Sequence, residues 1–185
     1  LRIMSNETSS DQRPTAKPQR PKWKRWLKGG LFIYAGYVGL MYFAQRSILF
    51  PGQYRPSPPP MSLNAGMEQI WIESDGAKVE TLLLAPLPPR EQAAGGEPKP
   101  ASFKHPAIIY THGNVELIDD WLFELKPYRE VGCYVVLVEF PGYGRSTGKP
   151  SEAAIADVVT RVYDFLAARP DIDSTKIVAH GRSMG

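Results

Sequence analysis

One uncharged and strongly apolar run, from residue 29 to residue 45, constrains this chain more than any other feature. A membrane-spanning helix needs about 17–25 such residues, and Lys28 and Arg46 at the two ends have side chains long enough to reach the lipid headgroups. The apolar residues that follow lengthen the helix, and Pro51 then ends it. The run therefore predicts a transmembrane helix over residues 29–50 that binds the lipid bilayer.

Two other interpretations of this run remain open. A cleaved signal peptide also has a basic segment before its apolar run, but Tyr42 and Ala44 make a poor small-x-small cleavage site. A buried core helix is the second alternative. A run without a polar face is, however, unlike the amphipathic surface helix of a soluble domain.

The charge is unevenly divided along the chain. Residues 1–28 hold eight of the 22 Lys and Arg residues and two of the 19 Asp and Glu residues, so the remainder holds 14 basic and 17 acidic side chains. An acidic body argues against a nucleic-acid-binding fold. The arm over 1–28 is polar and basic, and we expect it to be disordered. Because Lys and Arg gather on the cytoplasmic flank of membrane helices, the N-terminus is predicted to be cytoplasmic, with the rest on the periplasmic, lumenal or extracellular side.

Proline-rich and low-complexity stretches divide the remaining sequence. Residues 51–66 begin PGQYRPSPPP and predict a stiff linker, so the folded body is expected over 67–185. A second stretch, 86–100, is typical of a surface loop. The chain starts at Leu1 and stops inside a motif at Gly185, and we therefore expect it to be the N-terminal portion of a larger protein.

The body alternates between strand and helix patterns. Two strands form a hairpin around Ser74, Asp75 and Gly76, and short apolar runs with few polar residues indicate strands buried on both faces. Ser151 is the expected N-cap of the strongest helix. The expected strands are 69–73, 79–85, 106–110, 133–138 and 176–180, and the expected helices are 119–131, interrupted at Pro127, and 151–168. This alternation predicts an α/β fold with a parallel sheet.

The last five residues, Gly181 to Gly185, read G-x-S-x-G and directly follow a predicted strand. At that place the pattern is typical of a nucleophile elbow, a sharp turn that lifts Ser183 above the sheet. The glycines Gly181 and Gly185 permit the close backbone approach that a Cβ would block. A glycine-rich loop that merely ends the strand is the alternative.

A second motif, Thr111-His112-Gly113-Asn114, follows another predicted strand. Acyl transfer requires two N–H groups aimed at the developing oxyanion, and we expect these from the backbones of Asn114 and Met184. His112 and Gly113 are expected to shape the loop, with His112 as a general base the less favoured alternative.

A third motif, Phe140 to Ser146, contains closely spaced glycines and predicts a tight turn in which Arg145 and Ser146 are turn-forming residues. Its spacing does not fit a phosphate-binding loop. Acidic side chains in the first turns of the following helix suit the helix dipole better than a metal. These are Asp119, Asp120 and Glu124.

The three motifs, each after a predicted strand, resemble the α/β-hydrolase superfamily. Within it the chain resembles the membrane-anchored, serine-aminopeptidase-like (Bem-forty-six-like) branch, over roughly residues 46–185. The resemblance implies a mostly parallel sheet with helices on both faces, reaching here only to the nucleophile elbow, and a catalytic Asp and His beyond residue 185. Glu139 stands where the family more often has Asp, and we expect no catalytic consequence.

This combination predicts a serine hydrolase that cleaves ester, thioester or amide bonds of a small-molecule or peptide acyl substrate through an acyl-enzyme on Ser183. The chemistry calls for no cofactor and no metal. An acyltransferase on the same scaffold and a non-catalytic membrane-tethered binding protein remain alternatives. Because the triad is incomplete within these 185 residues, we expect them to be inactive alone.

Overall fold

The computed structural model describes residues 23–88 and 103–185, and the chain divides into two compact units, 1–43 and 44–185. Residues 1–22 of the arm predicted over 1–28, and most of the loop predicted over 86–100, lie outside the described residues. Each unit is described here by itself.

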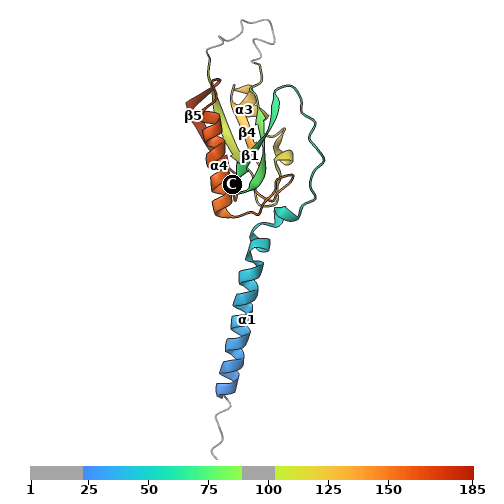
Figure 1. The fold of residues 1–185 in the computed structure, drawn as a ribbon, viewed down its shortest axis with the longest axis vertical. Coiled ribbons are helices and arrows are strands. Elements are labelled where there is room, and N and C mark those ends of the chain that lie inside the picture. The colour runs from blue at the N-terminus through green and yellow to red at the C-terminus, as the bar shows by residue number, and fades with distance from the viewer. Residues whose placement is uncertain (1–22, 89–102) are drawn as a thin grey trace, which may run out of the picture. The chain divides into compact units, whose positions relative to one another are not determined.

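The apolar run forms a single helix, α1, over Trp23–Leu49 (Figure 1). None of its residues is buried within the chain, and its length and hydropathy suffice to cross a membrane. The helix begins six residues earlier than predicted, so Lys24, Arg25 and Lys28 lie on its first turns and not in the arm.

Five strands form one sheet in the order β1-β2-β4-β3-β5. β1 and β2 are antiparallel, β2 is antiparallel to β4, and β3 is parallel to both β4 and β5. The strands are β1 (Met67–Ser74), β2 (Ala77–Leu84), β3 (His105–Thr111), β4 (Tyr134–Val138) and β5 (Ile172–Gly181). The predicted parallel arrangement is confirmed for β3, β4 and β5, and the hairpin makes the described sheet mixed.

The hairpin turns at Asp75 and Gly76, because Ser74 pairs directly with Ala77. Both central residues have positive φ, +46° and +72°, as the tight two-residue turn that matches strand twist requires. Asp tolerates this conformation and Gly adopts it without strain, so the sequence sets the register of the pair.

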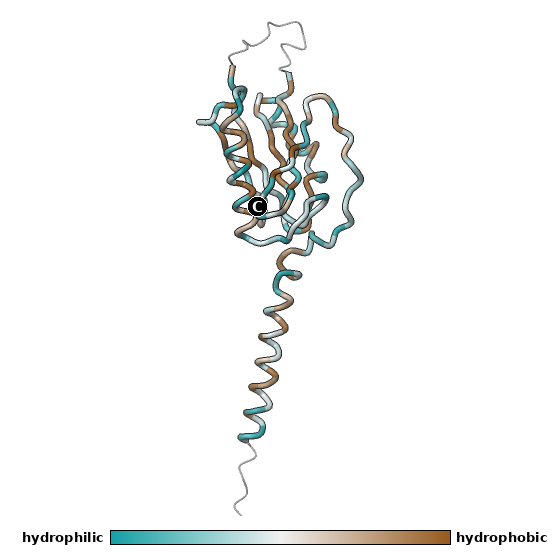
Figure 2. The backbone as a smooth tube through the Cα atoms, in the orientation of Figure 1, coloured by the Kyte–Doolittle hydropathy of each residue, from teal (hydrophilic) through white to brown (hydrophobic). Residues whose placement is uncertain are grey.

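Apolar side chains cover both faces of the sheet. Figure 2 shows that the strands themselves consist largely of hydrophobic residues. On one face, Val158, Val162 and Leu166 of α4 (Glu152–Ala167) pack on the strands. On the other face, the 3-10 helix η2 (Ile118–Trp121) and the short helix α3 (Lys126–Glu130) supply the cover. Helices on both faces of the sheet give the three-layer arrangement that buried parallel strands require.

The predicted N-cap of α4 is confirmed, since the Ser151 Oγ accepts a hydrogen bond from the Ala154 N–H at 3.2 Å. The interruption expected at Pro127 in the helix over 119–131 lies earlier in the chain, between Trp121 and Lys126. The segment divides into η2 and α3, and Pro127 lies in the first turn of α3, where its missing N–H costs no hydrogen bond.

The strand expected over 176–180 is present as the last part of a longer strand, β5. β5 is ten residues long, and most of its residues after Ile172 are exposed. Among the described residues β5 pairs with β3, while the predicted β3 and β4 are interior and buried.

β4 pairs only with residues 81–84 of β2. A loop forms hydrogen bonds with the first half of that strand. The Thr147 N–H donates to the Lys78 carbonyl at 2.9 Å, and the Lys78 N–H donates to the Thr147 Oγ1 at 2.8 Å. The Ser146 Oγ accepts from the Glu80 N–H at 2.9 Å. These contacts place a loop where a strand would otherwise pair.

The proline-rich segment predicted as a free linker over 51–66 begins as part of the body. Its first residues form a 3-10 helix, η1 (Pro51–Tyr54), in which Gly52 is buried. Met61 packs against the core beside η2 and α3. The compact unit therefore starts well before Met67, the predicted start of the body.

Candidate active site

Ser183 lies two residues after the end of β5, in a left-handed backbone conformation with φ +56°. Only Asp75 shares a positive φ among the described residues that are not glycine. This conformation is strained for a side chain with a Cβ, and such strain gathers at functional sites. A strained serine directly after a parallel strand is the geometry of a nucleophile elbow.

The two motif glycines allow this turn to close. The Gly185 N–H donates to the Arg182 carbonyl at 3.0 Å, and the Arg182 N–H donates to the Thr111 carbonyl at 3.0 Å. A Cβ on Gly181 would overlap the Gly185 carbonyl, and one on Gly185 would overlap the Thr111 carbonyl. The turn thus packs against the carboxyl end of β3, where the His112-Gly113-Asn114 loop begins.

The hydrogen bonds of the described residues distinguish the N–H groups of that loop. The Gly113 N–H donates to the Glu116 Oε2 at 2.8 Å and is therefore engaged. Within residues 23–88 and 103–185, the Asn114 and Met184 N–H groups have no hydrogen-bond acceptor. This pattern is compatible with the predicted pair of oxyanion donors.

The Asn114 carbonyl is held from two sides. It accepts hydrogen bonds from the Gly52 N–H and from the Tyr143 hydroxyl, both at 2.9 Å. Burial raises the pKa of Tyr143 to about 12, so the hydroxyl stays protonated and can donate at neutral pH. The position of Asn114 is therefore fixed by residues outside its own loop.

His112 is 1% exposed, and both of its ring nitrogens have partners. Nε2 lies 2.6 Å from the Glu139 Oε1, and Nδ1 lies 2.8 Å from the Gly113 carbonyl. A histidine with both nitrogens engaged in this way is poorly placed to take a proton from a serine. The contacts favour loop shaping over general-base catalysis.

Two solved structures share this architecture. An α/β hydrolase from Vibrio vulnificus matches with a TM-score of 0.50 and 19% identity over 65% of this chain and 37% of its own. The 2,6-dihydroxy-pseudo-oxynicotine hydrolase matches with a TM-score of 0.51 and 20% identity over 64% of this chain and 30% of its own. At these identities the two likenesses show the fold.

Sequence relatives give the family, although no family model matches the chain. The α/β hydrolase domain-containing protein WAV2 of Arabidopsis thaliana is 30% identical over 163 residues, which are 85% of this chain and 48% of WAV2. Protein bem46 of Schizosaccharomyces pombe is 26% identical over 80% of this chain and 48% of bem46. The chain belongs to the α/β-hydrolase superfamily. It spans about half the length of these relatives.

Within this hydrolase fold, sequence reasoning missed the importance of Glu139. Its carboxylate is fully buried and accepts three hydrogen bonds, from the His112 Nε2 (2.6 Å), the Phe140 N–H (3.1 Å) and the Ile118 N–H (3.2 Å). A Cβ on Gly144 would lie 2.8 Å from its Oε2, so the glycine turn closes over it. The carboxylate therefore joins the loop after β3, the helix η2 and the turn after β4.

A second missed carboxylate, Glu116, links the loop that contains Gly113 to the turn that contains Arg182. While its Oε2 accepts from the Gly113 N–H, its Oε1 pairs with the Arg182 Nη1 at 2.5 Å. The Arg182 guanidinium also lies over the Trp121 ring, 4.9 Å from its centroid. No local pattern identifies Glu116, because a single glutamate in a loop has many ordinary roles.

Arg145 is more than a turn-forming residue. Its guanidinium contacts the buried Glu80 at 2.7 Å and Asp119 at 3.0 Å, and its Nη1 donates to the Pro59 carbonyl at 3.0 Å. This cation thereby ties the glycine turn to β2, to η2 and to the proline-rich segment.

Two acidic residues at the start of η2, Asp119 and Asp120, form ion pairs with arginines. These ion pairs come in addition to the interaction with the helix dipole. Asp120 pairs with Arg55 at 2.5 Å and also accepts from the Leu117 N–H at 3.0 Å. The Arg55 hydrogen bond is the main reason why the pKa of Asp120 lies below its ordinary value. Asp119 pairs with Arg145, and Glu124 lies beyond η2 in the connection to α3.

Proposed function

We propose that this chain carries the nucleophile and the oxyanion donors of a serine hydrolase. The strained Ser183, held in a turn that Gly181 and Gly185 close against the end of β3, is the observation that carries the proposal. Its relatives are α/β hydrolases, which supports the hydrolase class.

In the proposed reaction the Ser183 Oγ attacks the carbonyl carbon of an ester, thioester or amide. The oxyanion is stabilised by the N–H groups of Asn114 and Met184. A general base takes the Ser183 proton and gives it to the leaving group, which departs and leaves an acyl-enzyme on Ser183. Water, deprotonated by the same base, then attacks the acyl carbonyl, and the acid is released as the proton returns to the serine. The general base and its carboxylate are expected beyond residue 185, in the order Ser, Asp, His of this fold.

The histidines of the described body do not offer a ready base. His112 is bound to Glu139, His180 contacts the Tyr128 hydroxyl at 3.0 Å, and His105 contacts the Gly132 carbonyl at 2.8 Å. A base supplied from elsewhere in the full protein fits these contacts better.

The experiment is covalent labelling of the full-length protein with a fluorophosphonate, which phosphonylates activated serines. Ser183→Ala should abolish labelling. Ser174→Ala, at an exposed serine of β5, should leave labelling unchanged. Labelling that persists in Ser183→Ala, or its absence in the wild type, would remove the serine-hydrolase proposal and favour a binding protein. Product analysis with an added alcohol distinguishes hydrolysis from acyl transfer.

A lipid ester is the substrate class we propose. The helix α1 can cross a membrane, and η1, two residues after its end, contacts the proposed oxyanion loop. One relative of 34% identity over 83 residues is named a lysophosphatidylserine lipase, from Gallus gallus. Turnover of lysophospholipids in mixed micelles tests the proposal, and hydrolysis of soluble peptides alone would contradict it.

We further propose that the N-terminus is cytoplasmic and that the hydrolase domain lies on the opposite side. The excess of Lys and Arg before α1 supports this orientation. A reporter that is active only in the cytoplasm, fused after Phe50, should be inactive. An active reporter would reverse the assignment.

A further inference from the structure

The residues that follow α1 lie directly on the proposed oxyanion loop. The juxtamembrane segment, defined here as Phe50–Arg55, contains η1 and belongs to the same compact unit as the sheet. Its Gly52 N–H donates to the Asn114 carbonyl, and its Arg55 Nη1 donates to the carbonyl of the next residue, Val115, at 3.0 Å. Two successive carbonyls of the loop are thus bound by one short segment.

Gly52 occupies a position in which no other residue fits without movement. It is buried, and a Cβ there would lie 2.6 Å from the Asn114 carbonyl oxygen and 2.8 Å from the Tyr143 Cδ1. The contact is therefore a close backbone approach and not a loose surface contact.

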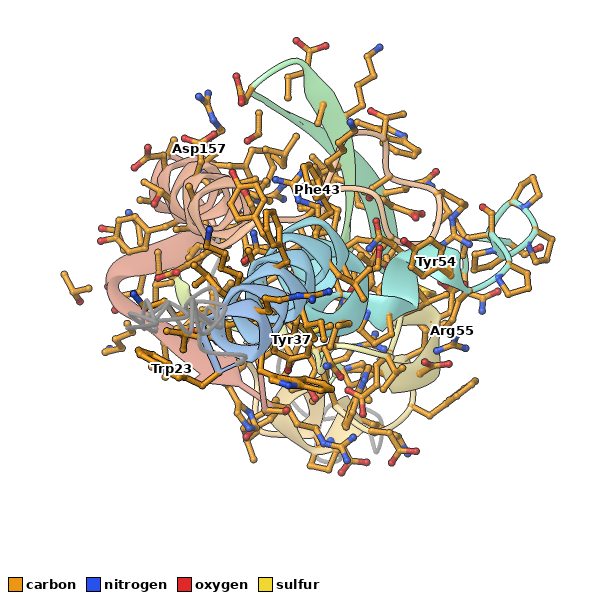
Figure 3. All side chains as sticks on the ribbon, turned by 90° about the horizontal axis from the view of Figure 1, so that it is seen from below. Trp23, Tyr37, Phe43, Tyr54, Arg55 and Asp157 are labelled. Atoms are coloured by element: carbon orange, nitrogen blue, oxygen red, sulfur yellow. The ribbon has the colours of Figure 1, made fainter. Side chains whose placement is uncertain are left out.

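Side chains reinforce the same contact. Phe50 and Met184 are both half-buried against one small apolar cluster, formed by Leu117, Phe140 and Tyr143. Arg55 also pairs with Asp120 at the start of η2, and Figure 3 shows Arg55 beside Tyr54 at the end of η1. The segment thus meets both the oxyanion loop and the cluster that supports the residue after the proposed nucleophile.

We propose that the juxtamembrane segment is a positioning element of the oxyanion hole, in which Gly52 and Tyr143 together fix Asn114 so that its N–H points at the developing oxyanion. This inference rests on the proposed function. The two hydrogen bonds to the Asn114 carbonyl hold the peptide plane that follows the Asn114 Cα. The preceding plane, which carries the Asn114 N–H, is held through its Gly113 carbonyl by the Glu116 N–H at 3.1 Å and the His112 Nδ1 at 2.8 Å. With the planes on both sides held, the Asn114 N–H keeps one direction before substrate binds. Donors that are oriented beforehand stabilise the transition state more than the bound substrate.

The first test is Tyr143→Phe in the full-length protein, with a para-nitrophenyl ester as substrate. This variant removes one of the two donors to the Asn114 carbonyl and adds no atom. We expect kcat to fall about fivefold, the equivalent of one net hydrogen bond, with KM unchanged. The matched control is Tyr134→Phe, which removes a phenol hydroxyl that donates to Asp171 at 2.6 Å, away from this loop.

The melting temperatures of the two variants separate positioning from folding, because each variant loses one hydrogen bond. Similar melting temperatures with a lower kcat only in Tyr143→Phe support the inference. An equal kcat in both variants, or a rise in KM alone, would overturn it.

A second variant pair tests the segment itself. Gly52→Ala should lower kcat more strongly, up to about a hundredfold, which is the loss measured for one oxyanion donor. The control is Gly36→Ala in α1, where an added Cβ meets nothing within 4 Å. Unchanged kcat in a folded Gly52→Ala protein would remove the inference alone. A wild-type protein that neither labels with fluorophosphonate nor turns over the ester would remove the proposed function and the inference together.

Discussion

Replacing Glu139 by alanine should destabilise the domain more than any other single change near the site. The substitution leaves three N–H donors, those of His112, Phe140 and Ile118, without their acceptor. Because the carboxylate is fully buried, water does not replace it without rearrangement. The loss of unfolding free energy therefore comes from buried N–H donors that have lost their acceptor, and not from the loss of a surface charge.

The magnitude follows from the number of donors. Each buried donor left unsatisfied costs about 1–3 kcal/mol, so three give a loss of roughly 3 kcal/mol or more. Domains have a net stability of about 5–15 kcal/mol, and the variant should therefore fold poorly. Glu139→Gln keeps an oxygen for the two donors on Oε1 and turns an amide N–H toward the Ile118 N–H, so its loss should be about 1–3 kcal/mol.

The free energy of unfolding, measured by denaturant titration with tryptophan fluorescence, should be lower for Glu139→Ala than for Glu139→Gln. The control is Glu130→Ala, since Glu130 is exposed and pairs only with Lys126 on its own helix. An exposed pair of this kind contributes about 0.2–1 kcal/mol. A Glu139→Ala protein no less stable than Glu130→Ala would refute the reasoning.

Three further predictions concern the turn and the loop around it. Gly181→Ala should abolish fluorophosphonate labelling of Ser183 in a protein that retains its circular dichroism spectrum, because a Cβ there overlaps the Gly185 carbonyl at the other end of the turn. Glu116→Gln should slow the labelling rate severalfold without abolishing it, since the amide keeps one of two acceptors; an unchanged rate would show that the bridge is not needed. The Arg55 hydrogen bond lowers the pKa of Asp120, so its stabilising effect is complete above the ordinary carboxyl pKa and is lost as pH falls through the lowered value. Asp120→Asn should therefore weaken the fall in stability with acid, measured as the slope of unfolding free energy against pH.

The sequence predicts those parts of the fold that depend on local patterns. Helix α4 follows from apolar spacing and the Ser151 cap, and the hairpin follows from the Asp75-Gly76 turn. The elbow motif implies a strained serine, and Ser183 has the positive φ that such a turn requires.

Contacts between segments far apart in the chain escape the same reasoning. The sequence places the interruption between η2 and α3 at Pro127, whereas it lies before Lys126, where Leu122 and Leu125 pack against the core. The burial of Glu139 and the contact between Gly52 and Asn114 depend on the tertiary arrangement, and neither residue has a distinctive sequence context. Proline-rich composition predicts a stiff linker, yet the Gly52 N–H and the Arg55 guanidinium of that segment donate hydrogen bonds to the body.

The loop that pairs with β2 also bears on how the protein avoids self-association. Unpaired N–H and C=O groups of a strand edge are a template on which another chain can add a strand. Here Ser146 and Thr147 occupy the hydrogen-bonding groups of Lys78 and Glu80 that β4 leaves free. Until this loop closes during folding, that half of β2 is exposed to strand addition. Once the loop has closed, the residues that fix the turn protect this strand against aggregation.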